Sequence, residues 1–431
     1  QTQINNEKII VIGAGIAGLA AAKKLQDSGH EVFILEARNR IGGRIHTDRS
    51  LGYALDMGAS WIHGIDDNPI YELALESRAP LSRPTDYDNH IIYDVEGDKD
   101  PISTEQSSEF LVQVGKRSLQ WGNEKRFNKS MGELIASLRA DGKLDFINNS
   151  RELDYLSNVV IEHEYAGAVE GMSAIQASEG EDLEGDDVVF PNGYDQLTEH
   201  LAKNLDIRLQ QVVNEIKYDA SGVTVITSQG SFTGDRVVVT LPIGVLRAGS
   251  VQFTPSLPKT KLQAIQAIGS GTLNKVWMHF AQAFWDTNKD VIGYVSEPKG
   301  QFSEFFYFPE LKDGKVLIGF NAGSYGEAIE ALSDEQIIDH AMATLTIMYG
   351  TQIPRPDQYK ISRWHSDPYA KGSYGYLRVG AKYSHREKLR ENVAQRLFFA
   401  GEATSADYAA TTEGAYRTGL QAAAEIIGAA N

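Results

Sequence analysis

The chain reads Lys-Ile-Ile-Val-Ile-Gly-Ala-Gly-Ile-Ala-Gly over residues 8–18, and this stretch decides the fold. A short apolar strand comes first, and the three glycines after it have G-x-G-x-x-G spacing. In that spacing Gly13 allows a tight turn, Gly15 lets backbone approach a pyrophosphate, and Gly18 lets a helix pack on the strand. The stretch therefore predicts a strand that leads into a dinucleotide-binding helix.

The residues that follow complete one β–α–β unit. An amphipathic helix runs through Leu25, Gly29-His30 ends it, and Glu31 to Leu35 reads as the next strand. Glu36 follows that strand, where a carboxylate accepts the ribose hydroxyls, so the sequence favours NAD or FAD over NADP. The helix N-terminus also offers phosphates its dipole and its backbone N–H groups, at Ala14, Ile16 and Ala17.

Composition narrows the class of partner. The 431 residues carry a formal net charge of -17, which argues against nucleic acid, because its binding rests on Lys and Arg that neutralise phosphates. An acidic field instead concentrates cationic ligands. The chain has no cysteine, which removes disulfides, thiolate zinc sites and a cysteinyl-flavin bond. We predict no metal site.

No apolar run approaches the length of a membrane span, so we expect a soluble protein without a transmembrane helix. The first residue is Gln1 rather than Met, which fits an exported, periplasmic chain after processing as well as a cytoplasmic one. The compartment and the oligomeric state stay open.

The second motif points to a flavin. Residues 36–44 read Glu-Ala-Arg-Asn-Arg-Ile-Gly-Gly-Arg, which resembles the second FAD signature of the flavin-containing amine oxidase superfamily. The resemblance assigns backbone contacts with the cofactor to Ala37, Arg38 and Gly43, and gives Arg44 cationic donors at the flavin end. Because there is no cysteine to form a cysteinyl link, we expect the FAD to be held non-covalently.

Further stretches resemble the polyamine and spermine oxidase branch, which is related to the catalytic domain of lysine-specific histone demethylases. They occur in the expected chain order and span almost the whole sequence. They are residues 58–64 with Asn68-Pro69, the strand from Val213 to Ile216, residues 271–276, residues 364–369, residues 372–374, residues 399–405 and residues 413–415.

The resemblance implies an α/β fold, in which a Rossmann-type FAD-binding domain is interleaved with an α+β substrate-binding domain. We place the FAD-binding domain at residues 1–75, 205–285 and 385–431, and the substrate-binding domain at residues 76–204 and 286–384. No long helical insertion fits in this length, which argues against a chromatin role.

The resemblance also assigns residues to the chemistry. Lys275 is expected to bind a water near flavin N5, Tyr374 to face the substrate with its ring, and His63 to steer an amine. The remaining cofactor contacts that it implies are Ala59, Ser60, Trp61, Val213, Trp364, Tyr369, Gly401, Glu402, Ala410 and Thr411. The implied reaction oxidises the C–H bond next to nitrogen, gives an imine that hydrolyses, and uses O₂ as electron acceptor with H₂O₂ as product.

The substrate is expected to be a small cationic amine, most simply a polyamine. The stretch Ser60 to His63 has no arginine for a substrate carboxylate, and the resemblance implies that Thr411 rather than a second aromatic ring faces Tyr374. Three helix carboxylates were candidates for the rim of a tunnel, Glu162, Glu164 and Glu170, and the role of Glu413 stays open. A monoamine or secondary-amine oxidase, or a non-catalytic flavin-bound interaction protein, are the alternatives.

Overall fold

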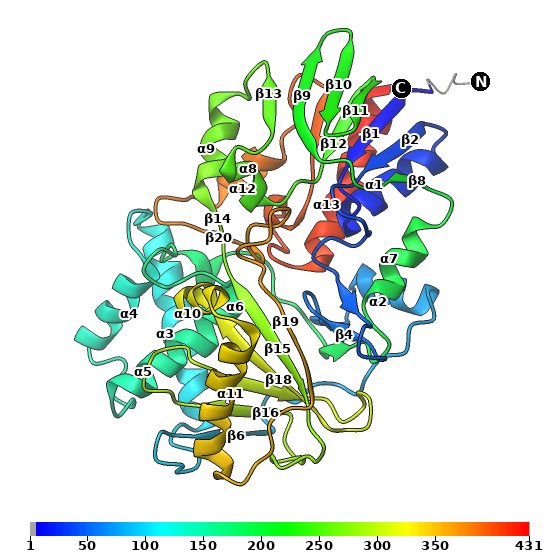
Figure 1. The fold of residues 1–431 in the computed structure, drawn as a ribbon. Coiled ribbons are helices and arrows are strands. Elements are labelled where there is room, and N and C mark those ends of the chain that lie inside the picture. The colour runs from blue at the N-terminus through cyan, green and yellow to red at the C-terminus, as the bar shows by residue number, and fades with distance from the viewer. Residues whose placement is uncertain (1–5, 431) are drawn as a thin grey trace.

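A computed structural model describes residues 6–430 and shows two sheets with different strand directions (Figure 1). The first is parallel, with strand order β21-β12-β1-β2-β8. Its strands are short, and those at the centre of the sheet are mostly apolar, as expected of parallel strands that are covered on both faces. Their bounds are Leu397–Phe399, Arg236–Val239, Lys8–Ile12, Glu31–Leu35 and Asp206–Arg208.

Helices α1 (Ile16–Asp27) and α13 (Thr412–Ala430) pack against one another beside this sheet. The contact is close, because a Cβ atom on Gly419 would lie 2.2 Å from the backbone oxygen of Ala17. The first and last long helices of the chain therefore form one layer, together with α2 (Pro69–Glu76) and α7 (Asp195–Ala202).

A four-stranded sheet of order β11-β10-β9-β13 lies next to the parallel sheet (Figure 1). Strand β9 (Val213–Asp219) alternates buried and exposed residues, as a half-buried strand does. Strand β11 of the same sheet spans Gly230–Gly234. The other two strands are Gly222–Thr227 and Gln252–Thr254.

The second large sheet has order β19-β15-β18-β17-β16-β6, mostly antiparallel. Its strands are Gln358–Ile361, Leu273–His279, Val316–Ala322, Glu304–Tyr307, Val291–Tyr294 and His90–Tyr93, and α11 (Asp334–Tyr349) covers one face. The strand and helix positions confirm the α/β class with two interleaved parts.

A helical layer completes this part of the molecule. Its helices are α3 (Thr104–Asn123), α4 (Met131–Ala140) and α5 (Ser150–Leu156), followed by a π-helix at Ser157–Glu162 and α6 (His163–Tyr165). The shorter elements are β3 (Thr47–Asp48), β4 (Leu55–Asp56), β5 (Trp61–Ile62), β7 (Val188–Val189), α8 (Ile243–Ala248), α9 (Lys259–Ala267), β14 (Ile268–Ser270), α10 (Gly323–Ala328), β20 (Gly375–Leu377) and α12 (Ser384–Arg390).

Two elements lie across the boundaries that we predicted. Strand β15 falls inside residues 205–285 but pairs with β18 and β19 in the second sheet. Helix α7 falls inside residues 76–204 but packs on α1, because Leu197 and Leu201 are apolar and share its core cluster. Among residues 6–430, no helix is long and apolar enough to cross a membrane.

Candidate active site

The glycine turn between β1 and α1 has the close contacts that its spacing predicts. A Cβ atom on Gly18 would lie 1.9 Å from the backbone oxygen of Gly13, and one on Gly13 would lie 2.4 Å from Thr240 Oγ1. Gly15 is the N-cap of α1, and the N-terminus of this helix has no side-chain cap. The buried first turn therefore presents backbone N–H groups that suit an anion.

Glu36 closes this turn from the end of β2. Its carboxylate is buried and accepts hydrogen bonds from the backbone N–H of Ala14 at 2.7 Å and of Arg38 at 2.9 Å. Gly42 bridges to Gly15, and a Cβ atom on Gly43 would lie 3.5 Å from the Gly15 Cα. Two stretches of backbone thus meet without side chains between them, which fits a dinucleotide with its phosphates at α1.

The Arg38 side chain has protein partners of its own. Its two terminal nitrogens each donate to Asp367 at 2.8 Å, and its guanidinium lies over the rings of Trp364 and Tyr369. Trp364 Nε1 donates to the backbone oxygen of Met57 at 2.9 Å. The predicted residues Arg38, Trp364 and Tyr369 are therefore brought together, with Asp367 as a partner that the sequence did not single out.

A second cluster joins the Gly-Gly-Arg loop to the C-terminal motif. Arg44 donates to Glu402 at 2.7 Å and to the backbone oxygen of Ser373 at 2.7 Å, and Glu402 accepts from the N–H of Gly375. Gly401 has a φ of 129°, and no atom lies within 4 Å of a Cβ placed there. The loop before α13 is held by Thr411, whose hydroxyl accepts from the Gly414 N–H at 2.9 Å.

The other predicted cofactor contacts occupy the edges of this region. Val213 is buried at the start of β9. Two residues earlier, the backbone N–H of Gln211 donates to the backbone oxygen of Glu36. Ala410 adopts a left-handed φ of 63° immediately before Thr411. These positions are compatible with cofactor contacts.

Lys275 lies in the middle of β15 and is buried. Its ammonium donates to the backbone oxygen of Gly58 and to Ser60 Oγ, and lies 3.4 Å from the backbone oxygen of Asp56. Burial lowers the pKa of Lys275 to about 7, and the nearby charge of Asp56 opposes that change. A lysine whose pKa is about 7 can exchange a proton at physiological pH.

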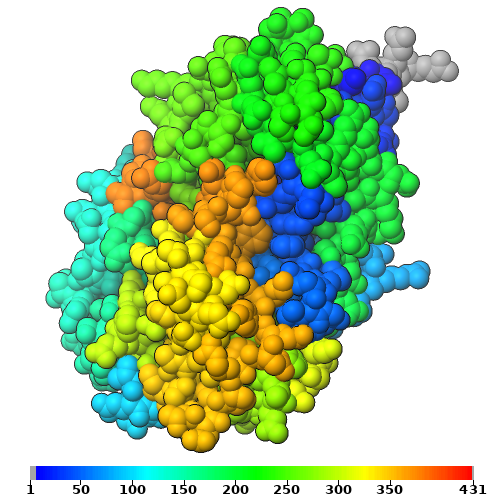
Figure 2. All heavy atoms as spheres, viewed as in Figure 1, coloured from blue at the N-terminus to red at the C-terminus, as the bar shows by residue number. Residues whose placement is uncertain are grey.

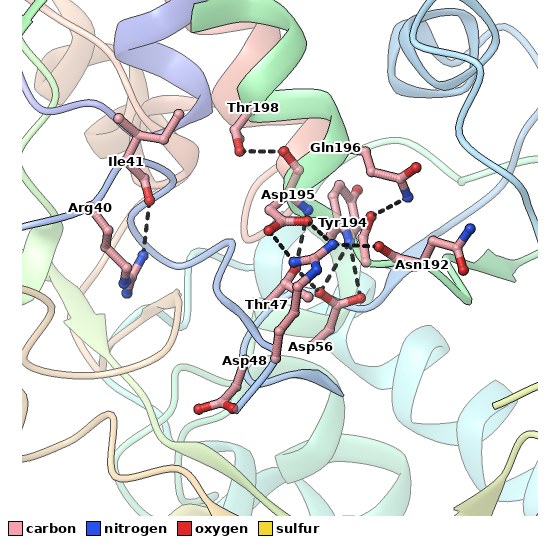
Figure 3. Close-up of polar contacts among 12 residues, drawn as sticks. Arg40, Ile41, Thr47, Asp48, Asp56, Asn192, Tyr194, Asp195, Gln196 and Thr198 are labelled. Carbon is pink, nitrogen blue, oxygen red and sulfur yellow. Dashed lines mark hydrogen bonds and ion pairs between the residues drawn. The ribbon is translucent and has the colours of Figure 1, made fainter. Parts of the chain in front are cut away.

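Asp56 is a buried partner of this lysine, and it was not predicted. Its carboxylate accepts from Thr47 Oγ1 at 2.7 Å and from the N–H of Tyr194 at 3.1 Å (Figure 3). Burial raises the pKa of Asp56 to about 7, whereas these hydrogen bonds and Lys275 lower it. The two groups titrate together, so a proton on either one changes the charge at the other.

Phe320 connects the lysine to the remaining predicted residues. It stands opposite Lys275 in the β15–β18 register, and its ring centroid lies 5.7 Å from the Lys275 ammonium. The same ring lies 5.8 Å from Trp61 and 6.3 Å from His163. Tyr374 donates its hydroxyl to the backbone oxygen of His163 at 2.6 Å, so it belongs to the same cluster.

His63 borders this cluster on the side of Trp61, with which its ring is stacked at 5.8 Å. Its Nδ1 lies 2.8 Å from Asp187, whose carboxylate also accepts from the Tyr87 hydroxyl at 2.6 Å and the Gly64 N–H at 2.8 Å. Protein packed around His63 lowers its pKa, but the hydrogen bond and charge of Asp187, with the charge of Glu164, outweigh this and raise it.

The three candidate rim carboxylates separate in the structure. Glu162 is buried and used internally, since it accepts from Asn158 and from the Val169 N–H, both at 2.9 Å. Burial has the largest effect on the pKa values of His63, Tyr87 and Tyr374. The charge of Glu164, which is exposed, raises all three values. Glu170 acts instead on Asp154, which places it elsewhere. Glu162 is therefore no rim residue, because its oxygens are already bonded inside the protein.

Glu413, the residue whose role stayed open, is buried at the start of α13. It pairs with Arg417 at 2.8 Å, one helical turn later. Burial raises the pKa of Glu413, and Arg417 opposes this change. Its carboxylate thus has a local partner in the protein.

Three functional candidates escaped the sequence reasoning: Asp56, Asp187 and Phe320. Asp187 ends an acidic stretch that begins at Glu179, and nothing in that stretch indicates its contact with His63. Phe320 had no local signal, because its position depends on the pairing of two strands.

Comparison with known proteins agrees with this geometry. Residues 16–427 match the sequence profile described as flavin containing amine oxidoreductase. The chain belongs to the flavin-containing amine oxidoreductase family. As an amine oxidoreductase it is an FAD-dependent enzyme of amine oxidation, and the motifs at residues 36–44 and 399–405 lie within the matched range, which begins inside the glycine motif at residues 13–18.

Individual relatives of this amine oxidoreductase are similar over nearly all of its length. It is 35% identical to polyamine oxidase 2 of Arabidopsis thaliana, covering 96% of this chain and 87% of the relative. It is 34% identical to lysine-specific histone demethylase 1 homolog 2 of the same plant, covering 98% of this chain but 59% of the relative. A putrescine oxidase structure with bound putrescine superposes with a TM-score of 0.81 at 22% identity, over 98% of this chain and 99% of that one, which shows the shared fold.

Proposed function

We propose that this amine oxidoreductase is an oxidase of polyamines that holds FAD non-covalently. The observation that carries the proposal is the set of negative charges around His63 and Tyr374. Asp187 bonds to His63 and Tyr87, and the charge of Glu164 acts on His63, Tyr87 and Tyr374. Such carboxylates attract the second ammonium group of a diamine substrate, whereas a monoamine has no second charge for them to attract.

FAD would be held by the glycine turn, by Glu36, and by the Arg44–Glu402 cluster, all of which fit it. When bound, FAD supplies the two-electron acceptor for the hydride that leaves the carbon next to nitrogen. We expect O₂ as the final electron acceptor, so that amine, O₂ and water give an aldehyde, the shortened amine and H₂O₂. The residues of this chain bind the substrate, orient it and handle its protons.

His63 would position the reacting amine. When its Nδ1 carries the proton that Asp187 accepts at 2.8 Å, its Nε2 is free to accept a hydrogen bond from an ammonium. Tyr374 and Trp61 would confine the amine with their rings, which favour a cationic or polarised group. Lys275, with a pKa of about 7, would hold the water near the cofactor and exchange a proton with it.

The test compares a diamine and a monoamine of equal chain length, octamethylenediamine and octylamine, mixed anaerobically with the FAD-bound enzyme. We expect the diamine, spermidine and spermine to bleach the flavin absorbance at far lower concentration than octylamine. Equal half-saturation for the two matched amines would show a monoamine oxidase. Absence of bleaching with every amine would show that the protein does not turn over.

Three variants connect this preference to the carboxylates. Glu164→Gln and Asp187→Asn are expected to reduce the ratio of diamine to monoamine efficiency by about tenfold, because each removes one charge from the substrate region. Glu170→Gln is the matched control, since that exposed carboxylate acts on Asp154 instead. A ratio that is unchanged in both site variants would remove the distal-ammonium contact from the proposal.

A further inference from the structure

A groove of about 380 Å³ is lined mainly by charged and polar side chains. It lies between the loop that follows β2 and strand β19, and Figure 2 shows the hollow where the blue surface meets the orange one. We call it the Arg40 groove. Its lining includes the charged and titratable side chains of Arg38, Arg40, His46, Asp48, Lys360 and Arg363.

The carboxylates of the Arg40 groove already have partners. Asp367 is bound by both terminal nitrogens of Arg38, and Asp334 pairs with Arg363 at 2.7 Å. Asp48 accepts from the N–H and the hydroxyl of Ser50, at 2.8 and 2.6 Å. Asp367 and Asp334 are therefore each paired with a cation, and Asp48 is held by neutral donors.

Two cations of the groove, Arg40 and Lys360, are not matched in this way. The one hydrogen bond of the Arg40 side chain within residues 6–430 runs from Nη1 to the backbone oxygen of Ile41, at 3.1 Å (Figure 3). A guanidinium carries five N–H donors, so most of them have no protein acceptor in the described chain. Lys360 reaches its nearest carboxylate, that of Asp48, only at 3.7 Å.

The electrostatics of this region agree with an uncompensated charge. Burial and then the charge of Arg38 lower the pKa of Arg40 to about 10. Burial and then the charge of Arg40 lower the pKa of His46 to about 4, so the imidazole is neutral at pH 7. Nearby Glu36 and Asp367 raise the pKa of Arg40 but do not bond to it.

We propose that the Arg40 groove binds a small oxyanion of the phosphate class, held by Arg40 from one side and Lys360 from the other. The planar fork of an arginine matches phosphate oxygens in pairs, and a lysine adds a point charge. A bound anion would also link the loop after β2 to β19. The volume accommodates inorganic phosphate and a phosphate ester alike, so both are tested.

Inorganic phosphate and glycerol phosphate are titrated separately into the FAD-saturated enzyme by calorimetry, with chloride replaced to hold ionic strength constant. We expect saturable binding that weakens about tenfold or more in Arg40→Gln, which loses the charge-assisted donors. Arg355→Gln is the matched control, because that arginine is exposed and pairs with Asp339 outside the groove. It is expected to bind like the unaltered enzyme.

A second variant covers the case in which Arg40→Gln fails to fold. Lys360→Gln keeps Arg40 and is expected to bind the same probes several-fold more weakly at the same ionic strength. Weaker binding of either probe in the groove variants than in Arg355→Gln supports the site. Equal affinity in all of these proteins, or no binding of either probe to the FAD-saturated enzyme, overturns it.

Discussion

Lys275 and Asp56 are buried next to one another, and burial moves their pKa values toward a common value of about 7. The Asp56 carboxylate is fixed by Thr47 and the Tyr194 N–H, while the Lys275 ammonium is fixed by Gly58 and Ser60. The pair therefore has a definite place in the fold and can be charged or neutral near pH 7. This relationship makes the pH profile of the enzyme informative.

Asp56→Asn is expected to shift that profile toward lower pH. The negative charge of Asp56 raises the pKa of Lys275, so its loss lowers the pKa of the lysine by about 1 unit or more. The measurement is the rate constant of anaerobic flavin reduction by spermidine as a function of pH. Asp339→Asn, at an exposed surface pair, serves as control. A profile that stays in place or moves to higher pH would contradict the coupling.

Lys275→Met tests the lysine itself. Removal of a positioned proton-transfer group slows a reaction by about a hundredfold, so flavin reduction or reoxidation should slow to that extent in stopped-flow measurements. The flavin spectrum should keep its intensity, because the side chains of the glycine turn and of Glu402 are untouched. Unchanged rates in both half-reactions would exclude Lys275 from the chemistry.

His279, at the end of the strand that carries Lys275, lies between two carboxylates. Its ring nitrogens are 2.6 Å from Asp357 and 3.1 Å from Asp313. Burial lowers the pKa of His279, but these hydrogen bonds and charges prevail and raise it. Since the folded state holds the proton more tightly than the unfolded state, the stabilisation is complete below the unfolded pKa of about 6.5 and lost as pH rises through the folded value.

His279→Gln should therefore lower the free energy of unfolding more at pH 6 than at pH 9. We expect a difference of about 1 kcal/mol, after allowing for solvent screening of the two partly exposed carboxylates. Urea unfolding of the FAD-saturated enzyme at the two pH values measures it. A loss that is equal at both values would mean that the protonated histidine does not stabilise the fold.

Arg386 and Glu179 form an ion pair that is buried on both sides. Arg386 also donates to the backbone oxygen of Ala403 at 2.9 Å, directly after Glu402. Glu179→Gln leaves a buried cation without its counter-charge, and such changes cost about 3 kcal/mol of folding stability or more. Glu124→Gln, in an exposed pair with Arg126, should cost less than about 1 kcal/mol in the same unfolding experiment. Similar losses in both variants would contradict a special role for the buried pair.

Much of the fold could be predicted because its signals are local. The glycines at residues 13, 15 and 18 and the apolar β1 and β2 specify a β–α–β unit within about thirty residues. Lys275 was singled out through the resemblance of residues 271–276, and in the structure it is buried with a lowered pKa. Local patterns could not specify which distant strands pair, and so β15 was placed with residues 205–285 although it pairs with β18 and β19.

The parts of the site that were not predicted are contacts between residues that lie far apart in the sequence. His63 and Asp187 are 124 positions apart, and Asp56 and Lys275 meet only when β4 and β15 are in place. A carboxylate in an acidic run or in a short strand has the same local sequence whether it faces solvent or a buried lysine. Burial and hydrogen-bond partners distinguish these cases, and both arise from tertiary packing.

The pairing of Arg44 with Glu402 spans 358 positions, and α13 packs against α1. During synthesis on the ribosome, the glycine turn therefore emerges long before the strand and helix that enclose it. A nascent chain that stops before residue 401 contains β21 but lacks Glu402. It also lacks α13, which packs against α1 in the complete protein. Under the proposed function, FAD would therefore bind late in synthesis, and a prematurely terminated chain would lack the stabilisation that a bound ligand gives.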